Sequence, residues 1–210
     1  MRMTNELIFR IIFTILWLVF ITNMTWIRYK TRKTADASPT SQAIRHESRI
    51  HIVALAMFAP FWFGGILLYI IFPSVIAFLS IPLPDWFRIL MVCVAVPSIP
   101  FTFWGYQTIG KNWVHAFESS KFLNSETQTL VTNGPYRYVR NPIYLGSFLF
   151  IVSIALVAAN WLILLPAIIL IILVYLQIKN EEAMLIDRFG DEYREYMKRT
   201  PRLIPRLFAK

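Results

Sequence analysis

The chain has 210 residues, of which 57% are hydrophobic and only 16% are charged. Soluble globular domains carry about 45–50% apolar and about 25% charged residues, so this composition excludes an ordinary soluble enzyme. It indicates an integral membrane protein, small enough to form a single domain over residues 1–210. The net charge is +9, and its distribution along the chain predicts how the protein is oriented.

Five apolar stretches are expected to span the membrane, because a spanning helix needs roughly 20 apolar residues. In chain order they cover residues 11–27, 52–79, 86–107, 143–159 and 161–178. The first three make up an N-terminal part, residues 11–107, that carries no recognisable motif. The last two are separated by very few residues and are expected to form a helical hairpin over residues 143–178.

The basic residues predict the orientation of these helices. Polar stretches at 28–51, 108–141 and 179–210 hold 6, 4 and 8 Lys and Arg residues, together 18 of the 21 in the chain. With five spans, all three stretches fall on the same side of the membrane. The positive-inside rule then places the N-terminus outside and the C-terminus in the cytoplasm.

The C-terminal segment is expected to be an amphipathic helix on the cytoplasmic face. Apolar side chains recur there at helical spacing from Leu185 to Met197, with acidic and basic side chains between them. Gly190 is expected to break or bend this helix, and residues 199–206, with two prolines, to continue as an extended strap. The expected fold is therefore all-α, with five transmembrane helices, a C-terminal hairpin and a cytoplasmic amphipathic helix.

The most informative segment is residues 134–144, Gly-Pro-Tyr-Arg-Tyr-Val-Arg-Asn-Pro-Ile-Tyr. Asn is a preferred N-cap and Pro is favoured at the first helical position, so the fourth span is expected to start at Asn141-Pro142. A helix N-terminus with Arg137 and Arg140 beside it is suited to bind a carboxylate or phosphate. The alternative is that both arginines only follow the positive-inside bias.

Paired carboxylates, Glu181 and Glu182, follow the fifth predicted span. Acidic groups are unfavourable at a helix C-terminus, so Arg137, Arg140 or a cationic ligand is expected to compensate them. The alternative is that water solvates both carboxylates at the membrane exit.

The sequence offers no metal site, because its three histidines and single cysteine are scattered. It carries no Gly-rich phosphate loop and no Ser-His-Asp arrangement. Neither a metal nor a nucleic acid is therefore an expected partner.

Taken together, these motifs resemble the isoprenylcysteine carboxyl methyltransferase family. The resemblance covers roughly residues 127–205: the segment 134–146, the hairpin, Glu181-Glu182, Phe189-Gly-Asp-Glu-Tyr193, and Pro201-Arg-Leu-Ile-Pro205. Phospholipid N-methyltransferases share a similar signature. The resemblance implies methyl transfer from S-adenosylmethionine, bound at the cytoplasmic face, to a lipophilic or lipidated acceptor. Carboxyl O-methylation is the expected reaction, with lipid amine N-methylation and thiol S-methylation as alternatives.

Carried over residue by residue, the resemblance assigns a site within residues 108–206. Catalytic roles fall to Arg140 and Glu181, and substrate contacts to Arg137 and Gln177. The implied cofactor-binding residues are Gln128, Leu130, Val131, Tyr136, Asn141, Pro142, Ile143, Tyr144, Glu181 and Glu182.

The chain departs from the family pattern at three positions. Asn141 replaces the usual His of an Arg-His-Pro segment, so no imidazole can carry a proton there. Gln128 replaces a His before the turn. Gln177 stands where family members can carry an Arg, which weakens the case for a prenylcysteine carboxylate. The changes at Asn141 and Gln177 leave a non-catalytic membrane subunit open as another class. An NADPH-dependent membrane reductase also stays open, because the hairpin architecture resembles that of some sterol reductases.

Overall fold

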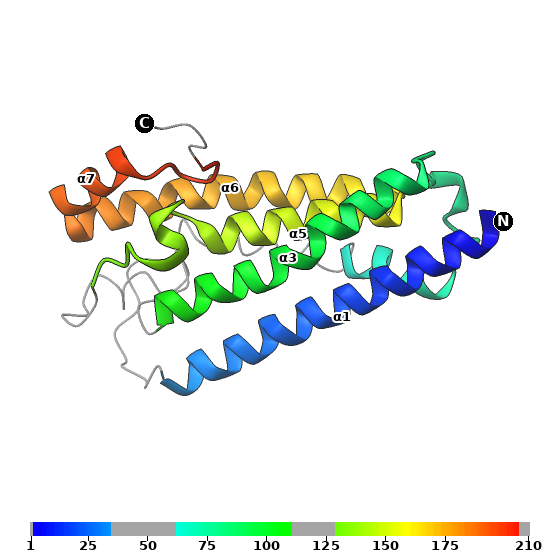
Figure 1. The fold of residues 1–210 in the computed structure, drawn as a ribbon, viewed down its shortest axis with the longest axis horizontal. Coiled ribbons are helices and arrows are strands. Elements are labelled where there is room, and N and C mark those ends of the chain that lie inside the picture. Colours follow the sequence, from blue (N-terminus) through cyan, green and yellow to red (C-terminus); the bar gives the residue numbers. More distant parts are fainter. Residues whose placement is uncertain (1, 35–61, 111–128, 206–210) are drawn as a thin grey trace.

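The computed structural model describes residues 2–34, 62–110 and 129–205, and the named elements of these ranges are all helices (Figure 1). The long helices run along one common axis. In chain order the elements are α1 (Arg2–Thr34), a helix Trp62–Ile71, the short η1 (Ala77–Leu79), α3 (Asp85–Ile109), the short η4 (Gly134–Arg137), α5 (Pro142–Ala158), α6 (Trp161–Phe189) and α7 (Asp191–Arg199).

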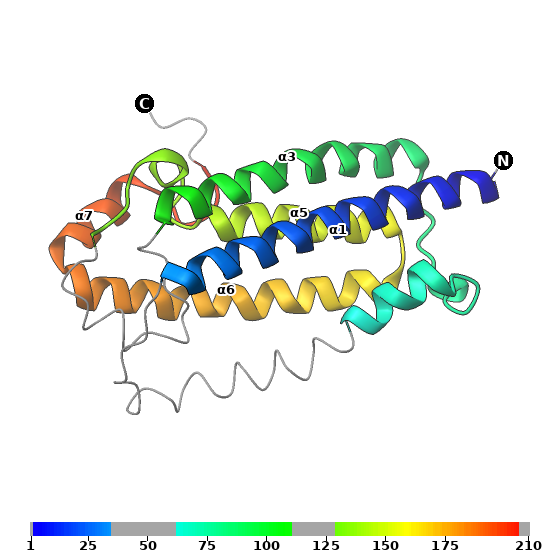
Figure 2. The ribbon, with the colours of Figure 1, turned by 90° about the horizontal axis from the view of Figure 1, so that it is seen from below.

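The helix bundle has two distinct ends (Figure 2). The turn end holds the starts of α1 and α3 and the two residues, Ala159 and Asn160, that join α5 to α6. The opposite end, which we call the cluster end, holds the end of α3, the start of α5, the end of α6, and α7. Asn160 makes the sharp reversal possible, because its side-chain oxygen accepts a hydrogen bond from the Leu162 N–H and caps α6.

Three helices are long and apolar enough to cross a membrane: Asn5–Ile27, Asp85–Ile109 and Trp161–Phe189. Trp62–Ile71 and Pro142–Ala158 are shorter apolar helices. The expected fold class, a helical protein that crosses the membrane more than once, is therefore confirmed. Many large apolar side chains on these helices are exposed, as lipid-facing side chains are in such a protein.

Two predicted boundaries are wrong. The second span was expected to run to residue 79, but its helix ends at Ile71, and a turn and η1 follow. Pro73, which has no N–H to donate, ends the helical hydrogen bonding there. The fifth span was expected to end at residue 178, but α6 continues as one helix to Phe189. The predicted break at Gly190 is confirmed, since this residue has a φ of 55° and separates α6 from α7. Residues 52–61 lie outside the described part of the chain.

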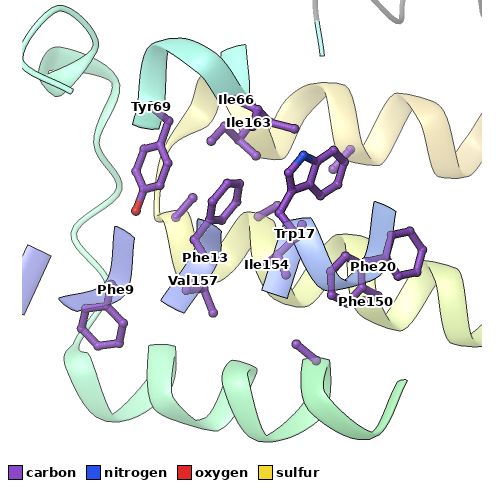
Figure 3. Packing of buried hydrophobic residues seen from close by; sticks show 14 of the residues in the cluster. Phe9, Phe13, Trp17, Phe20, Ile66, Tyr69, Phe150, Ile154, Val157 and Ile163 are labelled. Carbon is purple, nitrogen blue, oxygen red and sulfur yellow. The ribbon is translucent and has the colours of Figure 1, made fainter. Parts of the chain in front are cut away.

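Aromatic side chains of α1 form the centre of the core (Figure 3). Phe20 stacks on Phe150 of α5, with ring centroids 4.1 Å apart and planes 12° from parallel. Phe13 meets the edge of Tyr69 at 5.0 Å, which joins α1 to the helix Trp62–Ile71. Ile154 of α5 is fully buried between them. The core thus lies where α1, α5 and the helix Trp62–Ile71 meet.

α3 and α5 approach each other closely through glycine. A Cβ atom at Gly146 of α5 would collide with the Thr102 hydroxyl of α3, and would lie 3.1 Å from the Thr102 backbone nitrogen. A Cβ atom at Gly105 of α3 would lie 2.8 Å from a side-chain carbon of Ile143. Small residues allow membrane helices to pack backbone against backbone, and this close packing is one of the forces that hold such helices together. This contact holds the start of α5 against α3.

A buried arginine fixes the turn end. The Arg88 side chain, 2% exposed, forms a bidentate ion pair with Glu6 of α1, and its Nε donates to the Val157 carbonyl oxygen at 2.9 Å. The guanidinium also lies 3.9 Å from the centroid of the Phe9 ring. One side chain thus joins α1, α3 and α5. Asp85 adds a weaker contact at the surface, accepting from Asn5.

The close approach of α3 and α5 makes one glycine sensitive to substitution. We expect Gly146→Ala to lower the free energy of unfolding by about 1–3 kcal/mol, the usual cost of overpacking a tight contact. Gly64→Ala is the matched control, because no atom lies within 4 Å of a Cβ there. It should be neutral or stabilise by up to about 1 kcal/mol through helix propensity. Equilibrium unfolding in mixed SDS micelles measures both, and equal effects would contradict the packing argument.

Candidate active site

The turn η4 brings the motif segment to the cluster end. Gly134 has a φ of 55°, and a Cβ atom there would lie 2.8 Å from the Thr108 hydroxyl, so glycine is required. Tyr136 is buried, and its carbonyl oxygen accepts a hydrogen bond of 2.6 Å from the Tyr196 hydroxyl of α7. Burial raises the pKa of Tyr196 well above its ordinary value, so the hydroxyl stays a donor. The tyrosine pair therefore docks α7 onto η4.

The C-terminal strap pairs with the residues that lead into α5. The Arg140 N–H donates to the Pro201 carbonyl oxygen at 2.9 Å, and the Asn141 N–H donates to the Arg202 carbonyl oxygen at 3.1 Å. The Thr200 and Met197 carbonyl oxygens accept from the Arg140 guanidinium. Segments some 60 residues apart in sequence are thereby held side by side.

A buried carboxylate lies at the centre of this end. Glu182 is 2% exposed and receives five contacts from Arg140, Arg202 and Asn141. Arg140 reaches it at 2.9–3.0 Å, Arg202 at 2.6–2.8 Å, and the Asn141 amide at 3.2 Å. A buried carboxylate is tolerated only when charge and hydrogen bonds compensate it. We call these four residues the Glu182 cluster.

The neighbouring carboxylate has different surroundings. Glu181 accepts a hydrogen bond of 2.6 Å from the Tyr144 hydroxyl, which joins α6 to the first turn of α5. Gln177, one helical turn earlier, also hydrogen-bonds to Glu181. No lysine or arginine of the described ranges forms an ion pair with it. Glu181 is thus a half-buried acceptor with neutral partners, beside a carboxylate, Glu182, whose charge two arginines compensate.

Two expectations about these residues are wrong. α5 begins at Pro142 as predicted, but the Asn141 side chain makes no capping hydrogen bond. Its amide donates instead to Glu182 and to the Arg202 carbonyl oxygen. Glu181 and Glu182 do not lie at a helix C-terminus either, because α6 extends to Phe189. Side chains compensate the charge of Glu182 and hydrogen-bond Glu181, and neither carboxylate has to oppose the end of the helix dipole.

The other predicted site residues are distributed as follows. Pro142 and Ile143 are buried at the start of α5, against α3. Leu130 and Val131 are half-buried in an irregular segment that leads to η4. Arg137 is exposed in the last turn of η4 and lies outside the Glu182 cluster. Gln128 lies outside the described residues.

Sequence reasoning missed two residues that hold the site together. Arg202 was placed in the strap and in the motif that carries the family resemblance but was given no role, yet it contributes the shortest contact to Glu182. Tyr196 was placed on the apolar face and beside the same motifs, also without a role, although its hydroxyl donates to η4. The sequence does mark Arg202 as unusual. Pro201 and Pro205 prevent this stretch from continuing as a helix, so Arg202 is a basic residue on a non-helical segment.

The chemistry that this arrangement can support is limited and specific. In the described ranges, no three His, Cys, Asp or Glu side chains lie close enough to hold a metal ion. The site offers one carboxylate with neutral partners, the N-terminal turn of α5 and the exposed Arg137. Such a set is suited to bind a ligand that carries both a positive and a negative group.

Fold and site together define a helical membrane protein with a polar site where α5 and α6 meet. The family model described as phospholipid methyltransferase matches residues 86–192, about half of the chain. The chain belongs to this methyltransferase family, and the predicted resemblance is confirmed. The matched range contains Arg140, Tyr144, Glu181 and Glu182.

Individual relatives agree with this assignment. Protein-S-isoprenylcysteine O-methyltransferase of Schizosaccharomyces pombe is 34% identical over 97 residues, which cover 46% of this chain and 40% of that protein. Methanethiol S-methyltransferase 1 of Bradyrhizobium diazoefficiens is 41% identical over 70 residues, 33% of this chain and 24% of that protein. The alignments thus span less than half of each of these two relatives.

A solved structure shares the fold. The eukaryotic intramembrane Ras methyltransferase ICMT (isoprenylcysteine carboxyl methyltransferase) matches with a TM-score of 0.55 and 23% sequence identity. The match covers 91% of this chain and 67% of that one. Because the match covers most of the chain, the likeness in fold is not limited to the part that carries the sequence motifs.

The Glu182 cluster predicts a stability effect that distinguishes the two carboxylates. Glu182→Gln leaves two arginines without their buried anion and should lower the free energy of unfolding by about 3 kcal/mol. It should also speed hydrogen exchange at the backbone amides of Arg140 and Asn141, which donate to the strap, and of Thr200, which belongs to the strap. Unfolding in SDS micelles and hydrogen-exchange mass spectrometry measure both effects.

The matched control is Glu195→Gln. The Glu195 side chain is 57% exposed and pairs with Lys198 on the surface of α7, so its loss should cost no more than about 0.5 kcal/mol. The role given to Glu182 is wrong if the two variants behave alike.

Proposed function

We propose that this protein is an S-adenosylmethionine-dependent methyltransferase that methylates the carboxylate of a lipophilic, prenylcysteine-like acceptor. The observation that carries the proposal is the contact between Tyr144 and Glu181 beside the Glu182 cluster. It joins the start of α5 to α6 inside the region that the family model matches. The names of the relatives give methyl transfer as the reaction class.

The residues present fit the methyl donor. S-adenosylmethionine has a carboxylate, an ammonium group, a sulfonium centre and an adenosine, and when bound it supplies an electrophilic methyl group. Glu181, which no cation neutralises within the described ranges, suits the ammonium group or a ribose hydroxyl. The first-turn N–H groups of α5, at Ile143 and Tyr144, suit the carboxylate. Leu130, Val131 and Tyr136 would border the adenosine.

The roles of the charged residues follow from their contacts. Arg140 donates through Nε and both terminal nitrogens to Glu182, Met197 and Thr200, so we propose that it holds the site in shape. Its predicted catalytic role stays a prediction. Arg137 is exposed on η4 and would orient an acceptor carboxylate. Gln177, bonded to Glu181, would border the acceptor.

The environment suits this type of reaction. An acceptor carboxylate is already an anion, so its methylation requires positioning and exclusion of water more than proton transfer. This removes the objection raised by Asn141, which cannot act as a base. The apolar surfaces of α5 and α6 adjoin the site, and a lipid-like acceptor would reach it from the bilayer.

We further propose the membrane arrangement. Five helices cross the bilayer, with α5 and α6 as a hairpin, in a single domain. The concentration of basic residues at the cluster end supports a cytoplasmic site and C-terminus, with the N-terminus outside.

Cofactor binding tests the first part of the proposal. Purified protein in detergent should bind S-adenosylmethionine or its demethylated product in isothermal titration calorimetry. Glu181→Gln keeps the side-chain shape but removes the charge, and should weaken binding about tenfold, or about 1.4 kcal/mol. Tyr144→Phe should weaken it less, because it removes one neutral hydrogen bond.

The control for this measurement is Glu195→Gln, which removes an equal charge from the surface of α7 and should bind like the wild type. Binding of NADPH with no binding of either methionine compound at millimolar concentration would favour a reductase. A protein that binds none of these ligands would be a non-catalytic subunit.

Methyl tracing tests the acceptor. With methyl-labelled S-adenosylmethionine and N-acetyl-S-farnesylcysteine in detergent, label should enter the lipid extract and be released by base as methanol, as an ester requires. Arg137→Gln should raise KM for this acceptor by about tenfold without changing cofactor affinity. Phosphatidylethanolamine or an alkyl thiol can be supplied in place of the farnesylcysteine acceptor. Label that enters one of these compounds and resists base would identify N-methylation or S-methylation.

A further inference from the structure

A cavity with several polar side chains in its lining lies at the turn end, away from the Glu182 cluster. Its volume is about 340 Å³, and it lies between α1, the helix Trp62–Ile71 and the connection from α5 to α6. Its polar lining consists of Glu6, Arg10, Tyr69, Ser74, Ser80 and Asn160. The proposed methyl transfer uses none of these residues.

Two hydrogen-bonding groups in this cavity have no protein partner. Arg10 Nε and the Tyr69 hydroxyl are both buried, and neither forms a hydrogen bond within the described structure. Tyr69 is only 5% exposed. The Arg88 guanidinium, which donates to Glu6 and Val157, also lies within reach of the Tyr69 oxygen, but a guanidinium can only donate, so the Tyr69 O–H is left without an acceptor. Buried polar groups almost always have partners, so these two donors, which line one cavity, are suited to a hydrogen-bond acceptor from outside the chain, either a ligand or solvent.

The charge balance of the cavity favours an anion. Glu6 is already paired with Arg88 by two hydrogen bonds, so its charge is compensated. Asn160 uses its amide on the Ile76 carbonyl oxygen and its oxygen on Leu162. No carboxylate of the described residues forms an ion pair with Arg10. The cavity therefore offers one uncompensated positive charge and two donors, and lacks an available anion.

The position of the cavity suggests where such an anion comes from. Phe72, Phe78 and Trp86, in the segments around it, are 56%, 81% and 67% exposed. An exposed Trp at the end of a membrane bundle, such as Trp86, is typical of the depth of the lipid headgroups. A phospholipid phosphate would meet Arg10 and Tyr69 at this depth.

We propose that the turn-end cavity binds a phosphate oxyanion, supplied by a phospholipid headgroup. The Arg10 guanidinium and the Tyr69 hydroxyl donate to the phosphate oxygens. Because the ligand contacts α1 and the helix Trp62–Ile71 beside the Arg88–Glu6 ion pair, its binding stabilises this end of the bundle. The site is independent of the proposed methyl-donor site at the other end.

Thermal unfolding of the full chain in detergent tests this proposal. The three probes are dioctanoyl phosphatidylglycerol, inorganic phosphate and dioctanoylglycerol, which lacks a phosphate. We expect saturating phosphatidylglycerol to raise Tm by roughly 5 °C, since a ligand that binds only the folded state stabilises it. Dioctanoylglycerol should change Tm by less than about 1 °C.

Variants attribute the shift to the cavity. Arg10→Gln and Tyr69→Phe should each reduce the shift to less than half of its wild-type value. Arg194→Gln, which removes one charge from exposed α7, should leave it unchanged. Tyr69→Phe removes only one hydroxyl group and should still fold. It therefore provides the test even if Arg10→Gln does not fold.

The outcomes are distinguishable. A shift with phosphatidylglycerol alone supports a lipid site, and a shift with both phosphate compounds supports an oxyanion site that also accepts free phosphate. An equal shift with dioctanoylglycerol, an unchanged shift in both cavity variants, or the absence of any shift overturns the proposal. Binding of S-adenosylmethionine does not enter this measurement, so either proposal can fail alone.

Discussion

The arrangement of the candidate site depends on one buried charge. Glu182 lies in the interior with 2% exposure, and only Arg140, Arg202 and Asn141 make that position tolerable. These partners come from the segment before α5 and from the C-terminal strap, which are far apart in sequence. Because an uncompensated buried carboxylate is costly, the charge forces both segments to stay against α6. The start of α5, and with it the Tyr144 hydroxyl, is positioned as a result.

Adjacent residues on α6 thereby have separate functions. Successive residues of an α-helix point about 100° apart, so Glu181 and Glu182 face different neighbours. Glu182 meets two guanidinium groups, whereas Glu181 meets a phenol and an amide. A carboxylate with cationic partners is poorly available to a ligand, and one with neutral partners is available. The pair that looks equivalent in sequence is therefore one anion held by cations beside one that is free of cationic partners within the described ranges, and the proposed function assigns ligand binding to the second.

The sequence predicted those features that local chemistry determines. Apolar runs located the helices, the Asn-Pro step located the start of α5, and Gly190 marked the break before α7. The continuation of α6 to Phe189 could not be predicted from the sequence. Polar residues after position 178 end the apolar run, but they do not end the helix. The sequence also could not pair Asn141 with Glu182 or assign Arg202, since these contacts depend on how the strap returns to α5.

Both ends of the bundle use the same physical device. Arg88 and Glu6 fix the turn end as the Glu182 cluster fixes the other, and apolar packing such as Phe20 on Phe150 fills the length between them. Apolar contacts alone attract membrane helices weakly, because lipid tails are equally apolar. Ion pairs at the two ends set the register of helices that would otherwise slide. The polar groups of both proposed sites lie at these ends of the described bundle, so the proposed lipophilic acceptor and charged donor would meet at the membrane boundary.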